Sequence, residues 1–236
     1  MDATYSDVGT RNLRVLDGAV RFQSWMLGQA LPYLRGDVIE IGSGIGTYTA
    51  RAGAHLPEHT ITATDIDPVL CGELKERFGE SKNISVDQLD ITNTSIHEQY
   101  GSAFSFNVFE HIKDDERAFR NTHALLKPGG VFVVLVPAHP KLYNRIDEAV
   151  GHYRRYTKQE LVTKATQAGF VIEDAHYFNV FAIPGWIFQG KFLGKGTVSE
   201  GSMRAYDMLV PMFRFIETRI FRRRIGISLV AVLRKQ

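Results

Sequence analysis

The feature that constrains the fold most is a glycine-rich turn at residues 42–46. The apolar run DVIEI at 37–41 precedes this turn, and a helical pattern at 47–56 follows it. A strand that leads through glycines into a helix brings bare backbone and a helix amino terminus close to a ligand, because glycine has no side chain to hold the ligand away. The turn therefore predicts a nucleotide-type binding site, with a purely structural glycine turn as the alternative.

The same alternation of short apolar runs and helical patterns continues along the chain. It is typical of a parallel sheet with helices on its faces, and so of an α/β fold. The expected strands are 37–41, 60–64, 84–89, 104–109, 131–136, 170–175 and 227–233. The expected helices are 20–34, 47–56, 68–78, 114–126, 157–169 and 206–222. The pair Thr157 and Glu160 matches a capping box at the start of one of these helices.

Composition excludes several classes of protein. Of the 236 residues, 44% are hydrophobic and 23% are charged, which is typical of a globular chain and excludes disordered and fibrous ones. The single Cys71 cannot form an internal disulfide, the polar amino terminus lacks a signal-peptide layout, and no run approaches the roughly 18 apolar residues of a membrane span. We therefore expect a cytoplasmic protein. The net charge of +2 is too small to indicate a nucleic-acid partner.

Two acidic residues strengthen the nucleotide hypothesis. Asp65 ends the second expected strand, nineteen residues after Gly46, where a carboxylate can accept hydrogen bonds from both hydroxyls of a ribose. Asp90 follows the third expected strand, where it could meet an adenine amino group. The alternatives are a helix cap for Asp65 and a turn role for Asp90.

Taken in order, five motifs resemble those of class I S-adenosylmethionine-dependent methyltransferases. They are EIGSGIG at 40–46, TDIDP at 64–68, QLDI at 88–91, NVFEHI at 107–112 and LLKPGG at 125–130. The resemblance implies a Rossmann-like, doubly wound sheet of seven strands, mostly parallel with an antiparallel last strand. It also implies S-adenosyl-L-methionine as the cofactor. It assigns the methionine part to Glu40, Gly42, Ser43, Gly44 and Gly46, the ribose to Asp65, the adenine to Ile66, Asp90 and Ile91, and the methyl-transfer face to Asn107.

Other functions compete with methyl transfer. A nicotinamide-dependent oxidoreductase would share the first glycines and the acid, but its turn needs glycine or alanine where this chain has Thr47. A base-methylating enzyme would carry an Asn/Asp-Pro-Pro-aromatic motif, and this chain has NVFE at 107–110. A binding scaffold that keeps the cofactor fold without turnover is a third possibility.

Methyl transfer requires alignment of acceptor and methyl group, and a base only where the acceptor loses a proton. The candidates for that base are His111, His139 and His152, with His111 preferred. We expect no metal in the site. The alternative is a divalent ion held by Glu110 and His111, as the resembling quinone O-methyltransferases suggest, although Asn107 stands where those have a first glutamate.

The segment after the fifth expected strand, residues 137–156, is where the resemblance places acceptor contacts. Arg154 and Arg155, beside Tyr156, could clamp a phosphate or carboxylate, or could be surface arginines paired with Asp147 and Glu148. The letters GHYRRY resemble a bacterial methyltransferase subgroup with GHxRRY, whose members often accompany glycosyltransferases. That resemblance suggests a small, glycan, polyketide-like or lipid-linked acceptor.

The carboxyl-terminal part is aromatic and basic. Residues 202–236 carry a net charge of +6, whereas the rest of the chain carries −4. Trp186 lies in the aromatic stretch and is a candidate acceptor contact. The helix expected at 206–222 ends in three arginines, so residues 206–224 are candidates for an anionic membrane contact, an acceptor cover, a homodimer interface or packing on the sheet.

We expect a single domain in three parts. Residues 1–136 would form the cofactor-binding core, 137–224 the acceptor-side and lid elements, and 225–236 the last strand. Near the amino terminus, Tyr5, Arg21, Phe22 and Trp25 are candidates for a lid over the cofactor, with plain helix packing as the alternative.

Overall fold

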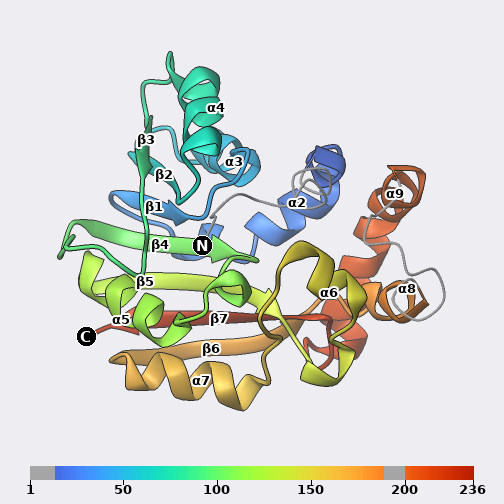
Figure 1. Ribbon diagram of the computed structural model, residues 1–236. Helices are drawn as coiled ribbons and strands as arrows, with labels where there is room; N and C mark the ends of the chain where they lie inside the picture. Colours follow the sequence, from blue (N-terminus) through green and yellow to red (C-terminus); the bar gives the residue numbers. More distant parts are fainter. Residues whose placement is uncertain (1–13, 189–199) are drawn as a thin grey trace.

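The computed structural model describes residues 14–188 and 200–236, and their strands form one seven-stranded sheet (Figure 1). The strands are β1 Val38–Ile41, β2 Ile61–Asp65, β3 Ile84–Gln88, β4 Tyr100–Phe106, β5 Leu126–Pro137, β6 Phe170–Phe178 and β7 Ser228–Lys235. Their order is β3-β2-β1-β4-β5-β7-β6, and β7 runs antiparallel to both of its neighbours. The expected α/β sheet with an antiparallel last strand is therefore confirmed.

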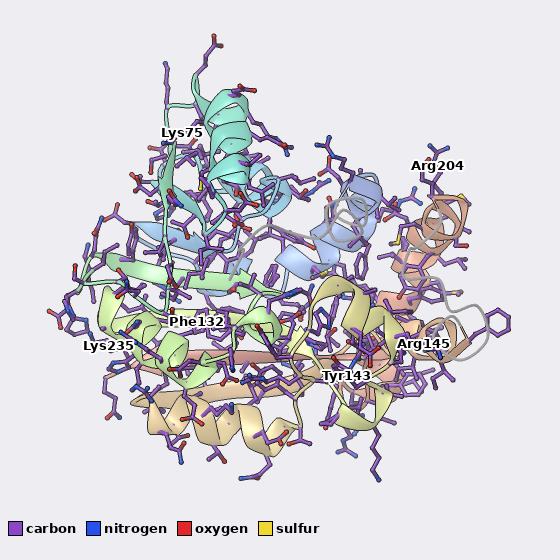
Figure 2. The ribbon with its side chains drawn as sticks, viewed as in Figure 1. Lys75, Phe132, Tyr143, Arg145, Arg204 and Lys235 are labelled. Atoms are coloured by element: carbon purple, nitrogen blue, oxygen red, sulfur yellow. The ribbon has the colours of Figure 1, made fainter. Side chains whose placement is uncertain are left out.

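Helices cover both faces of this sheet. They are α2 Val20–Leu27, α3 Thr47–His55, α4 Pro68–Phe78, α5 Asp115–Leu125, α6 Arg145–Val150, α7 Lys158–Gln167, α8 Ala182–Phe188 and α9 Glu200–Ile216. One apolar core joins α5 and α7 to the side of the sheet that carries Ile39 and Phe132. The other joins α2, α3 and α9 to the side that carries Val38 and Val133. Figure 2 shows Phe132 in the middle of the molecule. Adjacent residues of a strand face opposite sides, so the apolar runs supply both cores.

The boundaries of β4 and β5 differ clearly from the prediction. β4 begins at Tyr100 and ends at Phe106, whereas the apolar letters predicted 104–109. Asn107 has a φ of 56°, which turns the chain out of the sheet, and a 3₁₀ turn at Phe109–His111 follows. β5 begins directly at Leu126, so Gly129 and Gly130 lie inside a strand and do not form a separate turn after α5.

Two helices also differ. The helix predicted over 20–34 is divided into α2 and a 3₁₀ turn at Leu31–Tyr33, which contains Pro32. The helix predicted over 206–222 begins at Glu200 and continues past Ile216 into a π-helical turn at Glu217–Phe221. The carboxylate of Glu217 is buried and accepts hydrogen bonds from the amides of Asn179 and Val180. These bonds tie the end of this segment to the end of β6.

The helix caps use short polar side chains. Thr157 and Glu160 form the expected capping box at the start of α7. Asn144 and Asp147 form a second one at α6, which the sequence analysis did not predict. Within the described residues, no helix is long and apolar enough to cross a membrane.

Candidate functional site

The glycine-rich turn leaves the carboxyl end of β1 in a backbone conformation that favours glycine. Gly42, Gly44 and Gly46 have φ values of 75°, 55° and 80°. A Cβ atom on Gly42 would lie 2.4 Å from a methyl carbon of Val108, and one on Gly46 would lie 2.6 Å from the ring of Phe78. The turn is therefore closely packed by neighbouring segments, and its bare backbone is a structural requirement.

Asp65, at the end of β2, is bonded directly to this turn. Its Oδ2 accepts a hydrogen bond from the amide of Gly44 at 2.9 Å, and its Oδ1 accepts one from the amide of Asp67 at 3.0 Å. Burial raises the pKa of Asp65, while these two hydrogen bonds act in the opposite direction. Asp67 caps α4 by accepting from the amide of Val69 at 2.8 Å. One carboxylate thus fixes the glycine turn relative to the start of α4.

Glu40, just before the turn, and Ser43, within it, fix the turn to the strands and helix around it. Glu40 is 2% exposed, and burial raises its pKa to about 8. Thr49 donates a hydrogen bond from its hydroxyl to the Glu40 carboxyl, and Ser43 accepts one from the amide of Thr64 at 3.0 Å. Burial therefore favours the neutral form of Glu40, whose carboxyl group joins β1 to α3 under the glycine turn.

The residues expected around an adenine differ in their accessibility. Ile66 is 43% exposed just after β2, whereas Ile91 is 5% exposed and packs in the core beside α5. Asp90 Oδ1 accepts hydrogen bonds from the amide and hydroxyl of Thr92 at 2.8 and 2.7 Å, which is the turn role considered as the alternative. Asn107 is exposed at the end of β4. Thus Ile66 and Asn107 have accessible side chains, Ile91 contributes to the core, and Asp90 holds a turn.

Three ionisable side chains lie close together in space near the carboxyl end of β4. They are Glu110 and His111, which follow β4, and His152, which follows α6, and we call them the acceptor-edge cluster. The ring centroids of His111 and His152 are 4.6 Å apart, and Nε2 of His152 lies 3.7 Å from Oε1 of Glu110. The amide of Tyr153 donates to the carbonyl of Glu110 at 2.8 Å, so the segment after α6 is held against the turn after β4. The structure therefore brings together two of the three expected histidines.

Burial controls the charges in this cluster. Glu110 is completely buried, which raises its pKa to about 7 against the opposing effect of His152. Burial, with a smaller contribution from His152, lowers the pKa of His111 to about 4. The Nδ1 atom of His152 lies 2.6 Å from Oδ1 of Asp147, whose own pKa is held low by His152 and Arg155. The cluster thus combines a neutral imidazole, a second imidazole oriented by a carboxylate, and a buried carboxyl group.

Residues 39–132 match a family model described as a methyltransferase domain. This part of the chain is therefore similar to S-adenosylmethionine-dependent methyltransferases. The similarity implies S-adenosyl-L-methionine as the cofactor. The residues fit it, because the glycine turn offers bare backbone next to the Asp65 carboxylate at the carboxyl ends of β1 and β2.

Individual relatives show a similar sequence, and solved structures show a similar fold. The chain is 22% identical over 174 residues to malonyl-acyl-carrier protein O-methyltransferase 1 of Ilyobacter polytropus, covering 69% of this chain and 65% of that protein. It is 28% identical over 148 residues to a probable S-adenosylmethionine-dependent methyltransferase of Mycolicibacterium smegmatis, covering 58% and 53%. The S-adenosylmethionine-dependent methyltransferase structure from Mesorhizobium loti has a TM-score of 0.62 at 16% identity, covering 90% and 98%. The chain spans less than two thirds of the length of these curated relatives.

The expected acceptor contacts Arg155 and Trp186 bind to other parts of the chain. Arg155 is 5% exposed, donates from Nε to Asp147 at 2.9 Å, and donates from Nη1 to the carbonyl of Ala138 at 3.1 Å. Its guanidinium lies 4.3 Å from the ring centroid of Trp186, whose Nε1 donates to the carbonyl of Leu142 at 3.1 Å. Arg155 therefore pairs with Asp147, as in the alternative to an anion clamp. The pair lies in the interior, however, and not on the surface.

Arg154 and Tyr156 converge on another carboxylate, that of Asp115. Tyr156 is 1% exposed, and its hydroxyl donates to Oδ2 of Asp115 at 2.7 Å. Arg154 lies 2.6 Å from Oδ1 of Asp115, and Lys164 bonds to the same carboxylate. This placement does not favour an acceptor contact for Tyr156. The side chain of Arg154 remains 27% exposed and is the more accessible of the two.

The remaining candidates lie apart from the cluster. His139 stacks on Tyr177 at a centroid distance of 5.1 Å, and its Nε2 lies 3.0 Å from the carbonyl oxygen of Gly226. Trp25 is buried and packs on Phe178 at 4.6 Å, which is helix packing, and Tyr5 lies outside the described residues. The sequence analysis gave Asp147 no role of its own. The spacing of Asp147, three residues after Asn144, could have predicted its place in a capping box. In such a box the acid at the third helical position accepts a hydrogen bond from the amide of the N-cap residue.

Proposed function

We propose that the protein transfers a methyl group from S-adenosyl-L-methionine by in-line displacement to an oxygen or nitrogen of a small, glycan or lipid-linked acceptor. The observation that carries this proposal is the arrangement of neighbouring strands. The Gly44–Asp65 bond joins the ends of β1 and β2, and the acceptor-edge cluster follows β4, the other neighbour of β1. Since the carboxyl ends of parallel strands meet at one edge, the cofactor residues and the cluster share that edge.

Bound S-adenosyl-L-methionine supplies an electrophilic methyl group on a positively charged sulfur. The chain's own residues bind and orient: the glycine turn and Asp65 hold the cofactor, and Asn107 lines the transfer face. Alignment of donor and acceptor accounts for most of the rate gain in such a displacement. A proton lost by the acceptor would leave on the side of Glu110, His111 and His152, where the polar groups of this edge converge.

Calorimetry with S-adenosyl-L-methionine tests the cofactor half of the proposal. The intact protein should bind it saturably, and Asp65→Ala should weaken binding by at least about tenfold because a carboxylate hydrogen bond contributes roughly 1.5–3 kcal/mol. Asp65→Asn keeps one oxygen that can accept the hydrogen bond from the Gly44 amide. It therefore tests whether weaker binding comes from the lost carboxylate or from a disturbed glycine turn. Glu58→Ala, at an exposed acid before β2, is the control. No binding to the intact protein would refute the proposal.

Turnover distinguishes an enzyme from a binding scaffold. Incubation with methyl-labelled cofactor and pools of glycan, lipid-linked and acyl-carrier acceptors should give labelled product and S-adenosylhomocysteine in equal amounts. Cofactor binding without transfer to any pool would favour the scaffold. Binding of a reduced nicotinamide dinucleotide, followed by its fluorescence, would favour the oxidoreductase instead.

The surface of α9 supports a lipid-linked acceptor. The inner face of this helix, with Val210 and Phe213, is buried, and Phe213 stacks on Phe181 at 4.3 Å. The outer face keeps large apolar side chains that are 47–68% exposed: Met208, Leu209, Met212, Phe215 and, in the following turn, Ile220. Exposed arginines accompany them at 204, 214, 219 and 222–224, and Figure 2 shows Arg204 projecting outward from α9.

An apolar helix face bordered by arginines has the chemistry of an anionic lipid surface. We therefore propose that α9 contacts such a surface, with a second copy of the chain as the competing partner. The protein should sediment with phosphatidylserine vesicles, less at high salt and less with neutral vesicles. Met212→Asp with Phe215→Asp should abolish sedimentation, whereas Val69→Asp, at an exposed apolar site of α4, should not. Dimerisation without vesicle binding would assign the face to a second copy.

A further inference from the structure

Glu110 has a buried carboxyl group whose ion-pair neighbour in the described part of the chain is His152, at 3.7 Å. The residue has 0% exposure, and neither oxygen has a hydrogen-bond partner within residues 14–188 and 200–236. A buried carboxyl group normally has hydrogen-bond partners, because removing it from water otherwise costs several kcal/mol. A buried carboxyl group that lacks a hydrogen bond, beside an imidazole nitrogen, therefore points to a ligand that completes it.

The two imidazoles of the acceptor-edge cluster provide further donor atoms at the same point. One ligand atom from each of Glu110, His111 and His152 can be chosen so that all three lie within 4.8 Å of one another. Ligand atoms that share one ion are roughly 3–4 Å apart when each is about 2.1 Å from the metal. Small side-chain adjustments are therefore enough to bring the three atoms to one ion.

Hydrogen bonds to neighbouring groups orient both imidazole rings, as they do for histidines that bind a metal ion. Asp147 binds Nδ1 of His152 at 2.6 Å and is itself fixed by Arg155 and by the amide of Asn144, at 2.9 Å each. Nε2 of His152 is then left on the side of Glu110. His111 has a hydrogen bond to the backbone of Gly151. Ligating histidines usually use their second nitrogen in this way, which orients the ring toward the ion.

We propose that Glu110, His111 and His152 bind one divalent transition-metal ion, with Zn²⁺ as the reference ion, in a three-ligand site at the acceptor edge. Two imidazoles and one carboxylate are a known ligand set of catalytic zinc sites that keep an open position. Imidazole nitrogens favour transition metals over magnesium, which prefers oxygen ligands. The ligand set itself does not depend on the proposed function.

The role of the site rests on the proposed methyl transfer. An acceptor hydroxyl in the open position would lose its proton to solvent more readily, because the ion stabilises the resulting oxyanion. The oxygen lone pair then forms the new C–O bond while the S–C bond breaks, and its electron pair leaves on the neutral thioether sulfur. No oxidant or reductant is required, since the ion acts only as a Lewis acid.

Metal binding is measured on the full chain without any acceptor. After treatment with a chelator, the protein is dialysed against Zn²⁺ and the bound metal is counted by mass spectrometry, and Co²⁺ serves as a spectroscopic probe. We expect one ion per chain and ligand-field bands from bound Co²⁺. Glu110→Gln and His152→Ala should each weaken binding at least about tenfold, whereas His55→Gln, at an exposed histidine of α3, should leave binding unchanged.

Glu110→Gln keeps the volume of the side chain and removes only its charge, so it remains informative if His152→Ala fails to fold. Binding of S-adenosyl-L-methionine by each variant serves as the readout of folding. Zn²⁺ binding that is absent in the intact chain, or equal in Glu110→Gln and the intact chain, would overturn the metal site and leave the cofactor proposal standing. Loss of cofactor binding by the intact chain would overturn the methyl-transfer role alone.

Discussion

The carboxylate of Asp147 binds His152 and Arg155 at the same time, at 2.6 and 2.9 Å, in the interior of the protein. The two basic side chains belong to the segment after α6, whereas Asp147 belongs to α6 and also accepts from the amide of Asn144. One carboxylate therefore sets the orientation of a histidine at the acceptor edge and the position of an arginine that packs on Trp186. Asp147 is thus a positioning residue, which acts through the groups it holds.

Asp147→Asn should lower the free energy of unfolding by about 3–5 kcal/mol, because it leaves the buried Arg155 without its opposing charge. Urea denaturation followed by circular dichroism measures this loss. Glu148→Gln, at the exposed neighbouring position, should change the free energy by less than about 0.5 kcal/mol. Equal effects of the two substitutions would mean that the ion pair with Arg155 contributes little.

Glu40 should make the stability of the protein depend on pH. Its pKa is raised from 4.5 to about 8 in the folded state, so the folded protein binds more protons than the unfolded chain between these values. The stabilisation is complete below pH 4.5 and is lost as the pH rises through 8, with a slope of up to about 1.4 kcal/mol per pH unit.

Glu40→Gln removes this titration. Unfolding free energies measured between about pH 5.5 and 8.5 should fall more steeply with rising pH in the unsubstituted protein than in the variant. Parallel curves would show that Glu40 is not protonated in the folded state. Cofactor is omitted, so that binding does not contribute to the measured stability.

Gly46→Ala and Gly72→Ala should have opposite effects. Gly46 has a φ of 80°, and a Cβ there would lie 2.6 Å from Phe78, so we expect a loss of about 1–3 kcal/mol. Gly72 lies in the middle of α4, and outside the adjacent helix backbone no heavy atom of the described residues lies within 4 Å of the added carbon, so alanine should stabilise the helix by roughly 0.5–1 kcal/mol. Thermal unfolding of both variants gives the comparison, and a stable Gly46→Ala protein would contradict the packing of the turn.

Tyr156→Phe separates a structural role from an acceptor contact. Loss of the hydroxyl bond to Asp115 should cost about 1–2 kcal/mol of stability, since Lys164 and Arg154 still pair with that carboxylate. We expect unchanged affinity for S-adenosyl-L-methionine and an unchanged KM for the acceptor once one is found. A raised KM with unchanged stability would place the hydroxyl in the acceptor site.

Local chemistry explains why much of the architecture could be predicted. The apolar runs became strands, because a strand buried on both faces needs continuous apolar letters, and the Thr157–Glu160 spacing became a helix cap. Boundaries were less predictable. The apolar residues Val108 and Phe109 extended the predicted strand to residue 109. The strand instead ends at Phe106, because Asn107 adopts a positive φ and turns the chain out of the sheet.

By itself, the sequence determined the order of strands and helices, the glycine turn and the placement of Asp65 after β2, since these follow from periodicity and from residues with special backbone freedom. Only the tertiary structure decided which charges meet. It packs His152 against Glu110, and it buries the Arg155–Asp147 pair, which the sequence placed at the surface as the alternative to an anion clamp. The reason is that partner choice in the interior depends on which segments fold against one another, and the bond from Tyr153 to Glu110 across two elements is not encoded by any local spacing.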